Sequence, residues 1–232
     1  MRGAPKDSET LFSMIDGIFA VAITLSLTVL PESLRQRTSP YLILETASLL
    51  LIALTMLLLW LKLRTIVQLK EKLNYTDVAF IALILMVAVM IPKSGYLAIR
   101  WGHLEGNLWN WSHSQSVNAE YQGLLLLVEG VLLILSWRTM QSPRARCYPR
   151  SLRHWILGLE GIGMILLAAL VVVDNLIPNI NGVYIYAVPL ILLSEEGLCL
   201  IRMKAFEQSR NRSATITDTA LNETISSVRH HD

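Results

Sequence analysis

The stretch that decides the fold is SMIDGIFAVAITL, residues 13–25, in which an aspartate opens an otherwise apolar helical segment. A charge at the centre of a membrane helix costs roughly 2.5–3.5 kcal/mol on insertion scales, so Asp16 is expected to face protein or water. Small or hydroxylated side chains then recur at helical spacing on one narrow face, at Gly17, Val21, Thr24 and Thr28. Such a face suits close helix packing or a water-filled path.

The composition of the chain indicates a membrane protein. Of its 232 residues, 53% are hydrophobic and 16% are charged, with a mean hydropathy of +0.47. Soluble domains carry about 25% charged residues. The net charge of +2 is too small to favour a nucleic-acid partner. No nucleophile, zinc-protease or phosphate-loop motif occurs in the sequence, so we expect no enzyme activity, cofactor or metal site.

Six apolar segments predict an all-α, polytopic membrane protein with six transmembrane helices. Each segment approaches the ~20 residues that cross a ~30 Å hydrocarbon core. They occupy residues 11–30, 41–61, 78–99, 119–137, 154–177 and 182–203. We therefore expect a channel-like membrane domain over residues 1–203. Residues 204–232 are rich in Ser, Thr, Asn and charge, and this composition favours a disordered cytoplasmic tail.

The distribution of lysine and arginine predicts the orientation. If the N-terminus lies inside, sixteen of the twenty basic residues fall on the inner side, counting those at the helix ends. Cytoplasmic loops carry such an excess. We therefore expect a multi-pass protein of the cell membrane with both termini in the cytoplasm.

The segment Asp16–Leu25 resembles the first-helix signature of the transmembrane protein 175 family of potassium channels. That signature reads Arg-x-x-x-Phe-Ser-Asp, then Gly or Ala, then a run ending in Ala-Ile-Thr-Leu. Trp60 and Pro92 are similar in placement to the family's Trp and Pro in the second and third helices. The resemblance implies a six-helix potassium channel that assembles as a homo-oligomer, namely a tetramer. It also places Val21 at the family's apolar constriction.

The chain departs from the family pattern at several polar positions. Residues of other types replace the family's Arg, Phe and Ser in the first helix, its His after the Trp, and its Asn in the third helix. The replacements are Thr10, Met14, Ile15, Leu63 and Ile81. Asp16 therefore lacks the arginine that the resemblance would give it, and we expect it to have a structural role at the inner end of the first helix.

The residues of the first helix indicate what kind of pore the protein would form. Six helices in one chain offer no obvious axial path, so conduction requires several first helices around a shared axis. No Thr-Val-Gly-Tyr-Gly carbonyl filter occurs in the sequence, so selectivity must come from side chains and an apolar constriction. On this interpretation Val21 forms the constriction, Thr24 supplies a hydroxyl ring and Thr28 lines the outer vestibule.

Acidic residues in the later helices support an alternative function. Membrane acids are functional candidates by default, and a small proton-coupled carrier would use such a set. The candidates are Glu129, Glu160, Glu195 and Glu196. Glu160 and Glu196 also lie near the inner interface, where Arg153 or Arg202 could neutralise them. A third possibility is a membrane scaffold that conducts nothing.

Overall fold

The structure is a computed structural model that describes residues 5–28, 39–70, 73–104, 115–176 and 183–229. The chain divides into two compact units, Met1–Glu195 and Glu196–Asp232. The first unit contains the helical bundle and every candidate functional residue discussed below except Glu196.

Six α-helices and one short 3-10 helix form the described part of the chain. They are α1 (Pro5–Thr28), α3 (Ser39–Leu69), α4 (Tyr75–Leu104), α5 (Gln115–Met140), η1 (Arg144–Cys147), α6 (Arg150–Leu176) and α7 (Val183–Arg229). The all-helical class is confirmed. Five helices, α3 to α7, contain stretches long and apolar enough to cross a membrane. The apolar stretch of α1 in the described residues, Thr10–Thr24, is shorter.

Helix α3 extends further than its apolar run indicates. The sequence predicts a segment that ends at residue 61, where Lys62 and Arg64 interrupt the hydrophobic residues, but the spanning stretch is Thr46–Leu69. The helix continues because both cations find partners within the protein. The guanidinium of Arg64 lies 5.1 Å from the ring centre of Trp60, one helical turn earlier. Lys62 pairs with carboxylates of two other helices.

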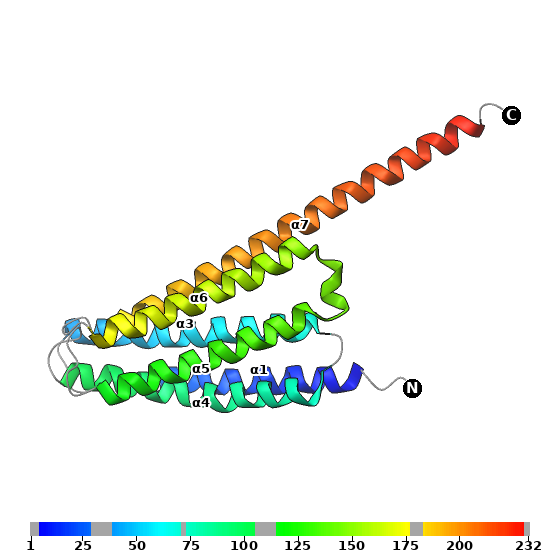
Figure 1. Ribbon diagram of the computed structural model, residues 1–232. Coiled ribbons are helices and arrows are strands. Elements are labelled where there is room, and N and C mark those ends of the chain that lie inside the picture. The colour runs from blue at the N-terminus through cyan, green and yellow to red at the C-terminus, as the bar shows by residue number, and fades with distance from the viewer. Residues whose placement is uncertain (1–4, 29–38, 71–72, 105–114, 177–182, 230–232) are drawn as a thin grey trace. The chain divides into compact units, whose positions relative to one another are not determined.

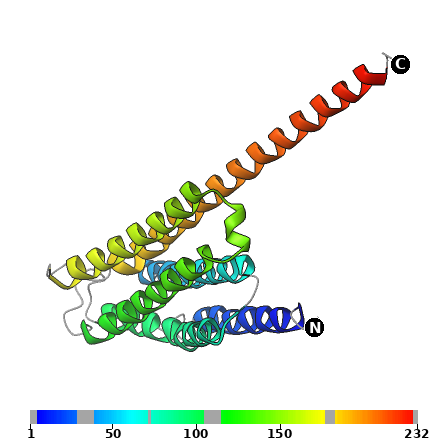
Figure 2. The same cartoon turned by 45° about the vertical axis from the view of Figure 1, so that its right-hand side comes forward.

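Helices α3, α4 and α5 pack against one another at the centre of the first unit. Helix α1 packs on α3 and α4, and α6 packs on α5. Figures 1 and 2 show these helices side by side. Their shared core contains almost only aliphatic and aromatic side chains, including Phe19, Leu59 and Ile84. This packing leaves one side of α1 outside the core.

Asp77 holds three helix ends together. It occupies the first turn of α4, where its Oδ2 accepts the backbone N–H of Asn74 at 3.0 Å, as an acid at the third helical position does in a capping box. Its Oδ1 accepts a hydrogen bond from Nε of Arg138 at the end of α5, at 2.8 Å. Lys70, directly after α3, forms an ion pair with the same carboxylate. The turn between α3 and α4 is thereby anchored to α5.

The segment for which composition favours disorder continues helix α7. Residues 204–229 are helical, within the second compact unit, which begins at Glu196 rather than after residue 203. No proline or glycine occurs between residues 198 and 229, so the sequence contains no strong helix breaker there.

Gly95 of α4 lies close to side chains of α3 and α5, and this gives a test of the packing. A methyl group at Gly95 would lie 2.7 Å from Cδ1 of Ile52 and 3.0 Å from Cε2 of Tyr121. Gly95→Ala should therefore destabilise the protein by about 1–3 kcal/mol, the usual cost of overpacking. The measurement is thermal unfolding in detergent, with Gly123→Ala as the control because nothing lies within 4 Å of that position. Equal effects of the two substitutions would contradict the packing.

Candidate functional site

A lysine is buried inside the bundle at the centre of the candidate site. Lys62 lies within the spanning stretch of α3, and only 3% of its surface is exposed. A buried ammonium group must be paired, because an isolated charge in an apolar interior is strongly disfavoured. The partners of Lys62 therefore define the site.

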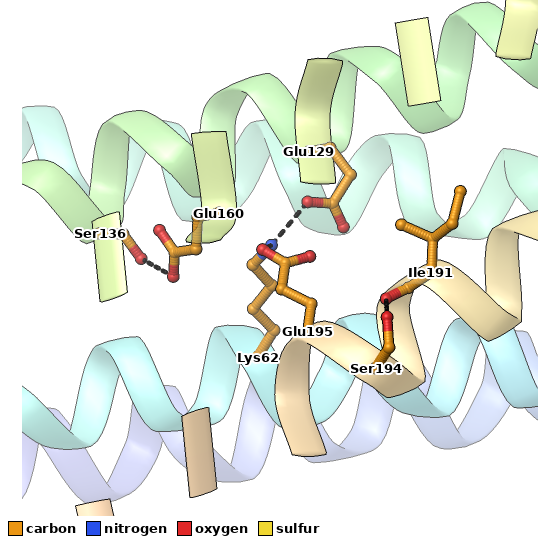
Figure 3. A network of polar contacts seen from close by, with 7 residues as sticks. All are labelled: Lys62, Glu129, Ser136, Glu160, Ile191, Ser194 and Glu195. Atoms are coloured by element: carbon orange, nitrogen blue, oxygen red, sulfur yellow. Dashed lines mark hydrogen bonds and ion pairs between the residues drawn. The ribbon is translucent and has the colours of Figure 1, made fainter. Parts of the chain in front are cut away.

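Two carboxylates from different helices contact Lys62. Its Nζ donates to Oε2 of Glu129 in α5 at 2.7 Å and to Oε1 of Glu195 in α7 at 3.0 Å. Both glutamates are buried. Figure 3 shows the lysine side chain reaching from α3 toward the two carboxyl groups. We refer to Lys62, Glu129 and Glu195 as the charged triad.

A third glutamate lies beside the triad. Glu160 of α6 is buried, and its Oε1 accepts a hydrogen bond of 2.7 Å from Ser136 of α5, as Figure 3 shows. It is within electrostatic range of Lys62. On the same helix, Gly163 gives the triad its room: a methyl group there would lie 2.8 Å from Oε2 of Glu195. Helix α6 can therefore approach α7 where the carboxyl group lies.

A second buried polar cluster lies toward the other end of α5. Asp174 of α6 is 1% exposed, and its Oδ2 accepts hydrogen bonds from the side-chain amides of Asn118 and Gln122. Tyr184 of α7 packs edge-on against Tyr121, with ring centres 6.3 Å apart. The Tyr184 hydroxyl is within electrostatic range of both Asp174 and Glu129.

The structure brings together the two polar residues that carry the family resemblance. Nε1–H of Trp60 in α3 donates to Oδ1 of Asp16 in α1 at 2.8 Å. Asp16 and Trp60 are both partly buried, and the bond fixes α1 to α3. Pro92 is buried in the interior of α4, away from this bond in sequence. Two residues later, the Ser94 hydroxyl donates to the carbonyls of Met90 and Ile91, which adds polar bonds to the helix near the proline.

The residues predicted to line a pore lie on the exposed side of α1. Gly17, Val21 and Thr24 are all exposed, and Val21 is 56% exposed. The Thr24 hydroxyl donates to the carbonyl of Ala20 at 2.7 Å. The side chain of Thr28 lies outside the part of the chain whose side chains are described. Their role in a pore stays a prediction.

The four glutamates that the sequence singles out differ in where they lie in the structure. Glu129, Glu160 and Glu195 all face the interior of the bundle, while Glu196 begins the second unit. The guanidinium of Arg153 donates from Nη1 to the carbonyl of Met140 at 2.9 Å. Sequence reasoning treats Lys62 only as a flanking cation and therefore misses its role. The signal in the sequence is that apolar residues resume soon after Lys62, at Ile66 and Val67, which lie four and five residues later.

Comparison with known proteins gives no match for this chain among protein-family models, curated proteins or solved structures. No group of three or more His, Cys, Asp or Glu side chains in the described residues is arranged to hold a metal ion. The fold and the buried polar clusters therefore define the class of protein: a helical, multi-pass membrane protein with ionisable groups inside its bundle.

The triad predicts a strong effect of removing its cation. Lys62→Met would leave two carboxyl groups buried without their counter-ion, and breaking such a pair typically costs about 3–5 kcal/mol. We expect a large loss of thermal stability in detergent. Lys93→Met is the matched control, because Lys93 is an exposed lysine in a neighbouring helix. Similar unfolding temperatures for the two variants would show that the triad does not stabilise the bundle.

The bond between α1 and α3 predicts that the acceptor at position 16 matters more than its charge. Asp16→Ala removes the acceptor of the Trp60 N–H and should cost about 1.5–3 kcal/mol, the range for hydrogen bonds to charged groups. Asp16→Asn retains an oxygen acceptor and should therefore lose less of the free energy of unfolding than Asp16→Ala. Thermal unfolding and size-exclusion chromatography would measure stability and assembly. An unaffected Asp16→Ala variant would show that the bond does not position α1.

Proposed function

We propose that the chain is a subunit of a homo-oligomeric cation channel of the cell membrane, conducting potassium through a pore lined by α1. The observation that carries this proposal is the division of α1 into two faces. Ile15, Phe19 and Ala22 are buried against the bundle, while Gly17, Val21 and Thr24 face outward. The resemblance assigns Val21 on this face to an apolar constriction, and helical spacing places Gly17 and Thr24 beside it.

The outward face of α1 would allow the α1 helices of several subunits to pack around one shared axis. A methyl group placed at Gly17 would meet no heavy atom within 4 Å, so another helix can approach closely there. Closed rotational symmetry would place the same face of every subunit toward the axis. A tetramer follows from the family resemblance, and this arrangement would make Val21 an apolar ring that gates by dewetting.

The geometry of Thr24 fits an ion-facing role. Its hydroxyl proton is donated to the carbonyl of Ala20, so the lone pairs of the oxygen remain available on the exposed side. Oxygen lone pairs are the groups that replace water around a potassium ion. A ring of these hydroxyls one turn from the Val21 constriction would therefore attract cations and would not attract anions.

The remaining features of the proposal follow from sequence. The excess of inner basic residues favours a cytoplasmic location for both termini, and in the proposed topology α1 is then the sixth span. The chain is proposed to act without a cofactor and without catalysing a reaction. Its ligand is the potassium ion, and its surroundings are the lipid bilayer.

Cysteine accessibility tests whether α1 lines a pore. In a background with Cys147→Ser and Cys199→Ser, the variants Val21→Cys and Thr24→Cys should react with a water-soluble thiol reagent in reconstituted vesicles and lose current. Ile23→Cys is the control, because Ile23 packs against the core on the other side of the helix. Equal reactivity at all three positions would rule out a pore lined by α1.

Conduction through the variants tests the roles of the two rings. Val21→Asn should wet the constriction and raise potassium conductance, whereas Thr24→Val should remove the hydroxyl oxygens and reduce or abolish the flux. Planar-bilayer recordings of purified protein would measure both. Unchanged currents in both variants would favour the scaffold or carrier alternatives.

A further inference from the structure

A pocket outside the charged triad opens at one end of the bundle. It has a volume of about 580 Å³, within the range of about 300–1,000 Å³ that is usual for small-molecule sites. It lies where the turn between α3 and α4 meets the connection from α5 to α6, which Figure 1 shows at the same end of the helices. Its lining residues are Lys70, Asn74, Trp137, Arg138, Gln141, Ser142 and Pro143. The proposed α1 pore uses none of them.

The pocket lies at the level where three apolar spans end. The spanning stretch of α3 ends at Leu69, that of α4 begins at Tyr75 and that of α5 ends at Met140. Every lining residue lies within three positions of one of these limits. In a membrane such positions lie at the height of the lipid headgroups, where tryptophan is enriched. Trp137 fits this level, because it lines the pocket and is 55% exposed.

Two cations line the pocket and share one carboxylate. Nε–H of Arg138 donates to Oδ1 of Asp77 at 2.8 Å, and Lys70 forms an ion pair with Oδ2 of the same residue. Asp77 is fully buried, whereas 31% of the Arg138 side chain is exposed. One carboxylate balances only one of the two cations, so a positive charge remains. No residue that lines the pocket in the described part of the chain carries a carboxyl group.

Both cations keep N–H groups with which to bind an anion. The bonds to Asp77 and to Oγ1 of Thr76 use two of the five N–H groups of the Arg138 guanidinium. The ion pair with Asp77 likewise leaves N–H groups on the Lys70 ammonium. Asp77 therefore orients the two cations without using all of their donors. A guanidinium binds two phosphate oxygens at once, and a lysine adds a point charge.

The chain adds positive charge along the connection from α5 to α6. Between residues 130 and 159 the sequence contains five arginines and no acidic residue. Arg146, in the 3-10 helix, and Arg150, at the start of α6, are exposed. Clusters of about four to eight basic residues beside a spanning helix are typical of surfaces that bind anionic lipids, as are basic pockets between spanning helices.

We propose that this pocket binds the phosphate group of an anionic phospholipid, with Arg138 and Lys70 as the groups that hold the phosphate oxygens. A lipid fits better than free phosphate, because exposed apolar side chains continue from the pocket along α5. Ile134 and Leu127 lie three and ten residues before Trp137, on the same side of the helix, and both are exposed. An acyl chain can follow this side of α5 while its headgroup occupies the pocket.

Lipid binding by the purified full chain in detergent tests this proposal. Native mass spectrometry would give the Kd of dioctanoyl phosphatidylglycerol and of dioctanoyl phosphatidylcholine, which share the phosphate and the chains but differ in net charge. We expect the anionic lipid to bind at least about fivefold more tightly, the contribution of one basic residue near an anionic headgroup. Gln141→Glu, which places a carboxylate in the pocket, and Lys70→Gln should each weaken phosphatidylglycerol binding by a similar factor.

Two matched variants control for the substitutions themselves. Gln141→Asn keeps a neutral amide in the pocket, and Lys93→Gln removes an exposed lysine that does not line it. Both should bind phosphatidylglycerol as the wild type does. If Lys70→Gln does not fold, Gln141→Glu still decides, because Gln141 lies outside the contacts that hold Asp77. Thermal unfolding of each variant would report its folding.

The outcomes separate the lipid from free phosphate and from the α1 pore. Inorganic phosphate at matched ionic strength should not displace phosphatidylglycerol, and displacement would show a site for free phosphate and overturn the proposal. Equal affinities for the two lipids, or unchanged binding by Gln141→Glu, would also overturn it. Thr24→Val should retain lipid binding, because the binding measurement does not depend on conduction through α1.

Discussion

The structure depends on the need to neutralise Lys62 inside the bundle. A lysine within a spanning helix costs up to about 2.5–3.5 kcal/mol on insertion scales, the value at the helix centre, unless the protein supplies partners. Glu129 and Glu195 supply them from two other helices, so one charge fixes the relative placement of α3, α5 and α7. Apolar packing alone tolerates rotation or sliding of a helix, whereas two short hydrogen bonds to one ammonium group do not.

The same pairing explains where the sequence predicts the fold and where it does not. Runs of apolar residues locate the six α-helices of the described residues, because a backbone in hydrocarbon must satisfy its own hydrogen bonds. The predicted end of α3 is wrong because hydropathy treats Lys62 as a boundary. Its partners lie 67 and 133 residues away in the chain, and no local pattern reports them. Helix α7 continues past the composition boundary for a simpler reason, the lack of a strong helix breaker.

The candidate site could be predicted only in part. Sequence identifies Glu129 and Glu195 as intramembrane acids, because carboxylates are conspicuous in apolar runs. It does not separate Glu195 from Glu196, since adjacent helical positions differ by about 100° and either could face inward. The amides Asn118 and Gln122 escape sequence reasoning because polar residues near a helix end fit a solvated turn equally well. The outward face of α1, in contrast, follows from helical spacing within one segment.

Helix α3 connects the charged triad physically with helix α1. Trp60 and Lys62 are two residues apart, and side chains at that spacing point to different sides of a helix. Trp60 bonds Asp16 and so holds α1, whose other face is the proposed pore wall, while Lys62 reaches the buried carboxylates. A change in the charge of the triad would alter the force on Lys62 and hence on α3. Because α3 also holds α1, the charged triad and the proposed pore wall are linked through one helix without any direct contact between them.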